Sequence, residues 1–164
     1  MDARNEAELA SRGNVTKVER TSDREVVVTR AFDAPARLVF EAWSNAELFE
    51  RWWVPKSMGM TLHSCEMDVR TGGTYRLDFG DGMVFFGQYL EVTPPTRIVW
   101  TNDEGTDASV TTVTFTETDG QTLLTVAEQY PSKDALDAEG GAADAMYETL
   151  DQLAELLDEL ASQP

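Results

Sequence analysis

The sequence has one cysteine and one histidine, and this excludes several kinds of site at once. Cys65 has no second cysteine to pair with, which rules out an intrachain disulfide and any metal site built from several cysteines. A catalytic triad would need His63. The neighbouring Ser64 would point to the opposite face of a strand, and no Gly-x-Ser-x-Gly elbow supplies another nucleophile. We therefore expect His63 at the surface or on an edge strand, and no metal or cofactor.

The sequence also lacks the segments that carry chains into or across membranes. No apolar run approaches the ~20 residues that a membrane-spanning helix requires. The start, Met1–Glu6, is acidic from its second residue and no apolar stretch follows it, unlike a secretory signal. Neither Gly-x-x-x-x-Gly-Lys nor Gly-x-Gly-x-x-Gly occurs, so nucleotide binding has no supporting motif. These absences favour a cytoplasmic protein without membrane insertion.

Lysine is scarce, and acidic residues dominate the charge. Lys17, Lys56 and Lys133 are the only lysines against 30 Asp and Glu residues, and the formal net charge is −17 at pH 7. Most of the excess lies in residues 102–164, where Lys133 is the only base. Such a surface repels phosphate backbones and anionic headgroups, which argues against nucleic-acid and membrane-surface partners. Ordinary solubility and adaptation to salt both stay open as explanations.

The length and composition predict a single soluble domain. With 164 residues, of which 41% are hydrophobic, the chain can bury one substantial core. Residues 1–22 have few apolar side chains and no sustained period, so we expect a mobile N-terminal tail there. The domain itself is expected over residues 23–164.

The first part of this domain is predicted to be a strand followed by two short helices. A β-branched, apolar run predicts a strand over 25–32. Pro35 then suits the first turn of a helix that runs to about residue 43. Ser44 and Glu47 have the spacing of a capping box, which predicts a second helix that Pro55 ends.

A series of short strand candidates fills the middle of the chain. Turn residues, such as Gly80-Asp81-Gly82, separate them, and connections this short join antiparallel neighbours. Phe85 and Phe86 are adjacent and both large, which blurs the alternation and predicts a bulge around Gly87. The six candidates cover roughly residues 60–68, 74–79, 84–92, 97–102, 109–117 and 122–130.

The last segment changes to a helical period. Apolar residues spaced four, three, four and three apart predict one long amphipathic helix, and Gly140-Gly141 marks its start or a break. About seven antiparallel strands cannot bury their inner face alone, so this helix must lie across them in an α+β fold. The apolar stripe consists of Met146, Leu150, Leu153, Leu157 and Leu160.

Aromatic and methionine residues are concentrated between residues 40 and 100. Flat and flexible apolar side chains suit the walls of a pocket for an apolar guest, although they can also simply fill a core. The group comprises Phe40, Trp43, Phe49, Trp52, Trp53, Met58, Met60, Tyr75, Phe79, Phe85, Phe86, Tyr89 and Trp100.

Five motifs in order resemble one known family. They are Phe32-Asp33-Ala34-Pro35, Val39-Phe40-Glu41-Ala42-Trp43, Arg51-Trp52-Trp53-Val54-Pro55, the segment from Cys65 to Gly73 and the segment from Pro94 to Trp100. Over about residues 24–160 the sequence resembles the single-domain bacterial homologues of the activator of the ninety-kilodalton heat-shock protein ATPase (AHSA type), within the START-like (SRPBCC) superfamily.

The resemblance implies a helix-grip fold, in which a curved antiparallel sheet wraps a long C-terminal helix. It also implies an apolar cavity between sheet and helix, because superfamily members include lipid and polyketide binders, aromatic cyclases and sacrificial antibiotic-resistance proteins. The eukaryotic co-chaperone has a further N-terminal domain that residues 1–22 cannot replace. No catalytic set of the family matches residues in this sequence.

We therefore expect this protein to bind a small, largely apolar ligand, such as a lipid, polyketide or aromatic molecule, in that cavity. Polar contacts from Glu128, Tyr130 and Tyr147 could orient the ligand. Contact with solvent at the cavity rim or ordinary packing explains these residues equally well. The expected wall residues are Phe40, Trp43, Trp52, Trp53, Met58, Tyr75, Phe79, Trp100, Phe115, Met146 and Leu150.

Two alternatives to simple binding stay open. A cyclase or hydrolase would need a buried Glu128 or His63 facing the guest. A co-chaperone or other protein-interaction module would need a contiguous exposed apolar patch.

The charge pattern generates the first prediction. The melting temperature should rise by several degrees between about 0.05 and 1 M sodium chloride, because the Debye length falls from ~10 Å at 0.1 M to ~3 Å at 1 M. Replacing Asp158 and Glu159 by Lys should reproduce part of the gain at low salt, since both carboxylates meet the negative end of the helix dipole. Thermal melts followed by circular dichroism measure the effect. A flat or falling melting temperature would leave solubility as the explanation.

Overall fold

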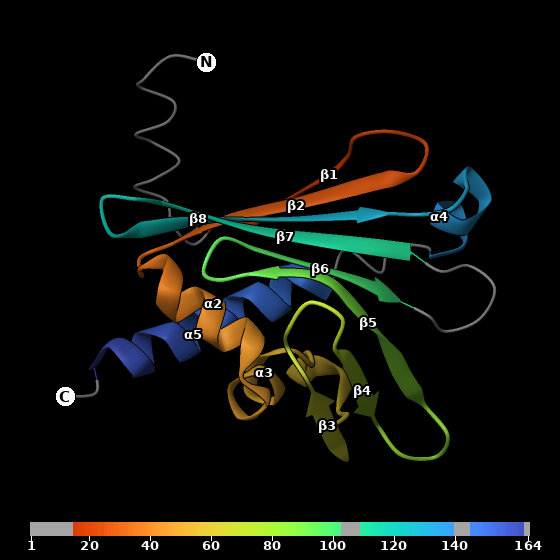
Figure 1. Cartoon of the computed structure of the whole chain (residues 1–164), viewed down its shortest axis with the longest axis horizontal. Helices are drawn as coiled ribbons and strands as arrows, with labels where there is room; N and C mark the ends of the chain where they lie inside the picture. Colours follow the sequence, from red (N-terminus) through yellow and green to blue (C-terminus); the bar gives the residue numbers. More distant parts are fainter. Residues whose placement is uncertain (1–14, 103–108, 140–144, 163–164) are drawn as a thin grey trace.

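The computed structural model describes residues 15–102, 109–139 and 145–162, which form one antiparallel sheet with helices against one face (Figure 1). The eight strands lie in the order β1-β2-β8-β7-β6-β5-β4-β3, and every pair of neighbours is antiparallel. The strands are β1 Lys17–Arg20, β2 Glu25–Phe32, β3 Ser64–Met67, β4 Thr74–Asp78, β5 Val84–Thr93, β6 Arg97–Asn102, β7 Ser109–Thr118 and β8 Gln121–Gln129.

Strand β1 corrects the expected tail over residues 1–22. Lys17–Arg20 pair with β2, and Val18 lies opposite Val28 and packs against the core. Val18 is the only apolar residue of this strand, so the segment has no alternation for a sequence pattern to detect. The edge of β2 supplies its backbone partners. Residues 1–14 lie outside the described residues.

The two short helices after β2 are confirmed, with one correction at their junction. Helix α2 covers Ala36–Ser44 and helix α3 covers Ala46–Trp52. The N-cap of α3 is Asn45, whose side-chain oxygen accepts a hydrogen bond from the Leu48 N–H at 3.3 Å. The expected cap, Ser44, is the last residue of α2. Asn and Ser both suit this position, and the end of α2 decides between them.

Three more helical segments complete the chain. A 3-10 turn, η1, covers Lys56–Met58, and the long helix α5 covers Ala145–Ser162. The short helix α4 at Lys133–Glu139 was not expected from the sequence, and the predicted break at Gly140-Gly141 lies outside the described residues. No helix in the described ranges is long and apolar enough to cross a membrane.

Strand β5 is irregular, but not where the adjacent phenylalanines suggested. Its pairing with β6 shifts between Tyr89 and Glu91, whereas its pairing with β4 runs evenly through Gly87. A Cβ on Gly87 would lie 1.8 Å from the Thr101 carbonyl oxygen and 2.8 Å from the Tyr75 ring. Strand β6 and the Tyr75 ring therefore lie so close to the backbone at Gly87 that a residue with a side chain would not fit there.

The long helix packs on the sheet as the helix-grip fold requires (Figure 1). Leu150 and Leu153 have no exposed surface and Leu157 is 3% exposed, so the predicted apolar stripe faces inward. Helix α5 contacts β2, α2 and α3. Buried Arg30 on β2 also forms an ion pair with Asp151 of the helix.

Arginines of other elements thus form ion pairs with the acidic helix α5, and this changes which substitution best tests its self-repulsion. Arg51 of α3 forms an ion pair with Glu159, so a lysine at position 159 would remove an attraction as well as a repulsion. Asp158 is exposed and has no ion pair among the described residues. Asp158→Lys alone is the cleaner test of self-repulsion.

The packing of helix α5 on the sheet generates the second prediction. Leu150→Ala or Leu157→Ala should lower the free energy of unfolding by about 2–5 kcal/mol, because each leaves a cavity between helix and sheet. The exposed Glu155→Ala should change it by less than ~0.5 kcal/mol. Urea unfolding of the three variants measures the difference, and equal effects would contradict this placement of the helix.

Candidate functional site

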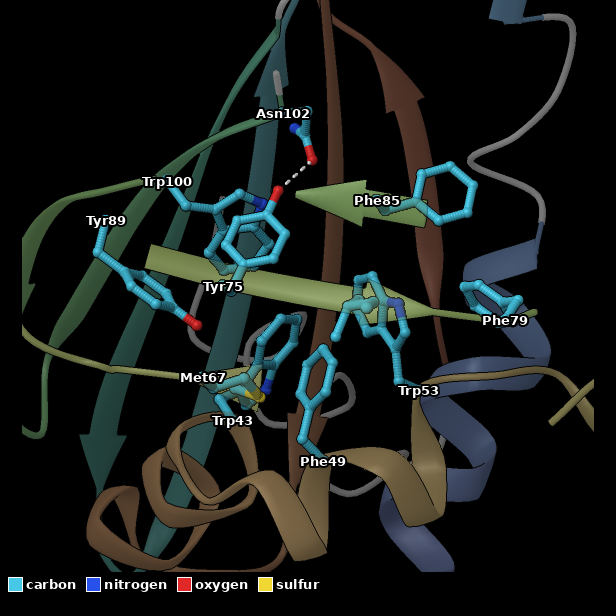
Figure 2. Close-up of a pocket in the computed structure, with 11 residues that line it drawn as sticks. Trp43, Phe49, Trp53, Met67, Tyr75, Phe79, Phe85, Tyr89, Trp100 and Asn102 are labelled. Carbon is cyan, nitrogen blue, oxygen red and sulfur yellow. Dashed lines mark hydrogen bonds between the residues drawn. The ribbon is translucent and has the colours of Figure 1, made fainter. Parts of the chain in front are cut away.

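A cavity lies where the helices do not fill the space beside the sheet, and it has two adjoining parts. The inner pocket has a volume of about 200 Å³ and lies between α2 and α3 on one side and strands β3 to β6 on the other (Figure 2). It is lined by Trp43, Phe49, Trp53, Met67, Tyr75, Leu77, Phe79, Phe85, Tyr89, Trp100 and Asn102.

The outer pocket, of about 380 Å³, continues from the inner one toward the first turns of α5. Five residues line both pockets: Trp53, Phe79, Phe85, Trp100 and Asn102. The remaining lining residues of the outer pocket are Val26, Val28, Val54, Pro55, Met58, Met60, Met83, Thr111, Val126, Glu128, Ala145, Met146 and Thr149.

Trp43 is the centre of the aromatic wall. Its ring centroid lies 4.7 Å from that of Trp52, and 5.8 Å from those of both Trp53 and Trp100. Phe49 stacks on Trp53 with centroids 4.8 Å apart. Contacts of this kind join the two helices to strand β6 through rigid rings. A wall of flat, stiff side chains cannot collapse to fill the remaining space.

The consecutive residues Trp52 and Trp53 have opposite roles. The Trp52 indole N–H donates to the Ala42 carbonyl at 2.9 Å, and the ring is fully buried between α2 and α3. Trp53 ends the helix and lies over the cavity, half-buried. Hydrogen bonding thus holds the first tryptophan in the core and leaves the second to line the cavity.

The chain after α3 is tied to α5 by one buried amide. The Gln152 side-chain nitrogen donates to the carbonyls of Trp52 at 2.9 Å and Val54 at 2.8 Å, and its oxygen accepts from the Lys56 N–H at 2.8 Å. One turn earlier, Glu148 accepts hydrogen bonds from Ser57, which lower the pKa of its carboxyl group. These bonds position Trp53 relative to the helix.

A hydrogen-bonded polar strip crosses the strands beneath the cavity. The Tyr75 hydroxyl lies 2.8 Å from the Thr101 carbonyl and 3.1 Å from Asn102 Oδ1 (Figure 2). The Asn102 amide donates to the hydroxyls of Ser109 at 2.9 Å and Thr111 at 3.2 Å.

The strip ends at a carboxylate. Ser109 and Tyr130 each donate a hydrogen bond to Glu128, at 3.2 and 3.1 Å. Four residues of this strip line the pockets: Tyr75, Asn102, Thr111 and Glu128.

Eight of the fourteen residues expected at the site line the cavity. Trp43, Trp53, Tyr75, Phe79 and Trp100 line the inner pocket, and Trp53, Phe79 and Trp100 extend to the outer one. The outer pocket adds Met58, Glu128 and Met146.

The other six expected residues lie elsewhere. Phe40, Trp52, Phe115 and Leu150 are buried in the main core, where α2, α3 and α5 meet the sheet. Tyr130 belongs to a small cluster with Val26, Ala135 and Leu136 beside the unexpected helix α4. Tyr147 is 44% exposed because the face of α5 that carries it points away from the core.

Sequence reasoning missed the polar lining residues Asn102 and Thr111 and the inner-pocket residues Met67 and Leu77. Four further lining residues, Phe49, Met60, Phe85 and Tyr89, belonged to the aromatic and methionine group but not to the expected wall. Met67 and Leu77 lie on short paired strands, where alternation can show which face is buried but not which part of that face lines a cavity. His63 is exposed and lines neither pocket.

Two titratable groups near the inner pocket stay protonated at neutral pH. Burial, with a smaller effect of Glu50, raises the pKa of the Cys65 thiol to about 11. Burial also raises the pKa of the Tyr89 hydroxyl, and negative charge at Cys65 and Asp68 would raise it further. No Lys, Arg or His lines either pocket within the described ranges, and no three potential metal ligands come together there.

Solved structures share this fold over most of the chain. A Rhodobacter sphaeroides protein is 21% identical with a TM-score of 0.79, and the match covers 89% of this chain and 99% of that one. A Nitrosomonas europaea protein is 23% identical with a TM-score of 0.75, over 87% and 99% of the two chains. A Chromobacterium violaceum protein is 26% identical with a TM-score of 0.70, over 83% and 98%.

Among curated proteins no match was found. Residues 33–158 match the family described as Activator of Hsp90 ATPase homolog 1-like protein, AHSA1. This range takes in α2, α3, strands β3 to β8 and most of α5, and hence nearly the whole cavity wall. The chain therefore belongs to the AHSA1 family.

Proposed function

We propose that this protein binds a small, largely apolar molecule in the cavity between the sheet, α3 and α5. The observation that carries the proposal is the pair of adjoining pockets, whose walls are aromatic, aliphatic and methionine side chains with polar groups along one strip. The outer pocket alone falls within the ~300–1,000 Å³ typical of small-molecule sites. A core built only for stability would leave little such space.

The polar strip gives the guest a fixed orientation. Asn102, Thr111 and Glu128 supply an amide, a hydroxyl and a carboxylate from the adjacent strands β6, β7 and β8, whereas the methionines Met58 and Met146 come from η1 and α5. In this arrangement an apolar body lies against the helices and polar substituents face the strands. Tyr130 acts indirectly, by donating a hydrogen bond to Glu128.

Exposed apolar side chains at the outer pocket form its entrance. Met58 is 57% exposed, Met83 46% and Phe85 37%, and all three line the outer pocket. Exposed apolar groups of this kind mark ligand grooves or partner surfaces. Their continuity with the cavity favours the entrance of a ligand site over a separate chaperone-binding patch.

The third prediction tests binding with a neutral fluorescent probe, N-phenyl-1-naphthylamine. Its fluorescence should rise saturably on addition of the protein, and amide NMR signals near Trp53, Trp100 and Met146 should shift together. Trp53→Ala should weaken binding about tenfold, because it removes a ring that lines both pockets.

The matched control is Leu123→Ala, which removes an exposed apolar side chain of β8 that lines neither pocket. This variant should bind the probe like the unsubstituted protein, and circular dichroism should show both variants folded. No saturable binding, or equal affinities of the two variants, would contradict the proposed function.

A further inference from the structure

Two hydrogen-bond donors of the inner pocket have no acceptor in the described part of the chain. The Trp43 indole nitrogen is buried without a partner. Tyr89 is only 4% exposed, and its hydroxyl makes no hydrogen bond there. In Figure 2 the Tyr89 hydroxyl points toward the side of the pocket where Trp43 and Met67 lie. Buried donors are almost always paired, so the buried Trp43 N–H requires an explanation, and the Tyr89 hydroxyl on the same pocket wall is a second donor without an acceptor among the described residues.

The neighbouring donors show that the chain can satisfy such groups where it needs to. The Trp52 N–H bonds to a backbone carbonyl, and the Tyr75 hydroxyl has acceptors within 3.1 Å. Trp43 Nε1 is one of only two buried polar side-chain atoms in the described ranges that have no partner, and the other, Arg30 Nε, is outside the cavity. Among the cavity residues described, the buried unsatisfied Trp43 N–H is thus particular to the inner pocket.

The charge of the cavity decides what kind of acceptor can enter. A carboxylate, Glu128, lines the outer pocket, and no basic side chain lines either pocket within the described residues. An anionic group would be desolvated beside apolar walls without a compensating cation, which is costly. Burial also keeps the Tyr89 hydroxyl protonated, and so available as a donor, through its raised pKa. The acceptor must therefore be uncharged.

Size and shape limit the group that carries this acceptor. A dry cavity of about 150 Å³ is known to hold benzene, so the inner pocket of about 200 Å³ has room for one aromatic ring with a short substituent. The rings of Phe49, Tyr75 and Trp100 offer it faces and edges for packing.

From these observations we infer that the inner pocket binds an uncharged aryl carbonyl group, whose oxygen accepts hydrogen bonds from the Trp43 N–H and the Tyr89 O–H. The inference rests on the proposed function and adds the chemical class of the group that the inner pocket takes. Met67 lines the same wall, and its flexible side chain can move aside for the oxygen.

The experiment compares three probes of one size: acetophenone, ethylbenzene and benzoate. Ethylbenzene has the shape of acetophenone without the oxygen, and benzoate carries a negative charge. We expect acetophenone to bind at least fivefold more tightly than ethylbenzene, and benzoate to bind more weakly than either. Titrations followed by NMR of the ¹⁵N-labelled protein measure all three affinities.

The indole signals report the bond directly. On addition of acetophenone the Trp43 indole proton should shift downfield, and ethylbenzene should not cause this shift. The Trp52 indole, which already bonds to Ala42 at 2.9 Å and lines neither pocket, should stay in place with both probes. Trp43→Phe assigns the signal, and its folding is checked from the remaining spectrum.

Tyr89→Phe is the main variant because it keeps the ring that packs in the pocket and removes only the hydroxyl. It should weaken acetophenone binding about fivefold and leave ethylbenzene binding unchanged. Tyr147→Phe, which removes an exposed hydroxyl outside both pockets, should change neither.

The outcomes separate the two proposals. If the naphthylamine probe binds but ethylbenzene matches acetophenone, or Tyr89→Phe affects neither, the carbonyl assignment is overturned and the proposed cavity function stands. If benzoate binds most tightly, the charge argument is overturned. If none of the four compounds binds, the proposed function fails together with the inference.

Discussion

The buried amide of Gln152 connects the parts of the molecule on which the cavity depends. Its three hydrogen bonds join α5 to the carbonyls of Trp52 and Val54 and to the Lys56 N–H, at the point where α3 ends. Without this connection the chain after α3 would have several unpaired backbone groups beside a buried helix. With it, Trp53 is held next to the helix, where its ring lines both pockets.

The cavity exists because the helices that cover the sheet are fixed on only part of it. Helix α5 contacts β2, α2 and α3, and α2 contacts β7 and β8, so the leucine row and the Arg30–Asp151 pair lie at one end of the sheet. At the other end, strands β3 to β6, helix α3 contacts β3, and the aromatic rings around Trp43 cover the remaining strands. Rigid rings in edge-to-face contact hold their spacing rather than collapse, and they leave a space that flexible aliphatic side chains would have filled.

The sequence was sufficient to predict the strands from β2 to β8, the helix pair and the long helix, because each has a period or a turn signal of its own. It failed where the deciding contact comes from elsewhere in the fold. Strand β1 has a single valine and depends on the edge of β2. Periodicity showed that Phe115 and Leu150 face inward, but inward positions become core or cavity wall according to which helix lies above them. Asn102 and Thr111 gave no sequence signal, because their polarity is typical of strand ends and outer faces.

Negative charge on the surface and negative charge in the cavity would both disfavour an anionic ligand, the first at long range and the second at short range. The net charge of −17 gives the molecule a negative field, which slows the approach of anions and is weakened by salt. Inside, Glu128 is the charged group on the described cavity wall, and because it is half-buried, salt screens its carboxylate less than it screens surface charges. Selection against anions at the surface should therefore fade as ionic strength rises, and selection at Glu128 in the cavity should fade less. If the cavity binds a ligand as proposed, fatty acids and phosphate esters should for this reason be poorer guests than neutral molecules, most clearly at low salt concentration.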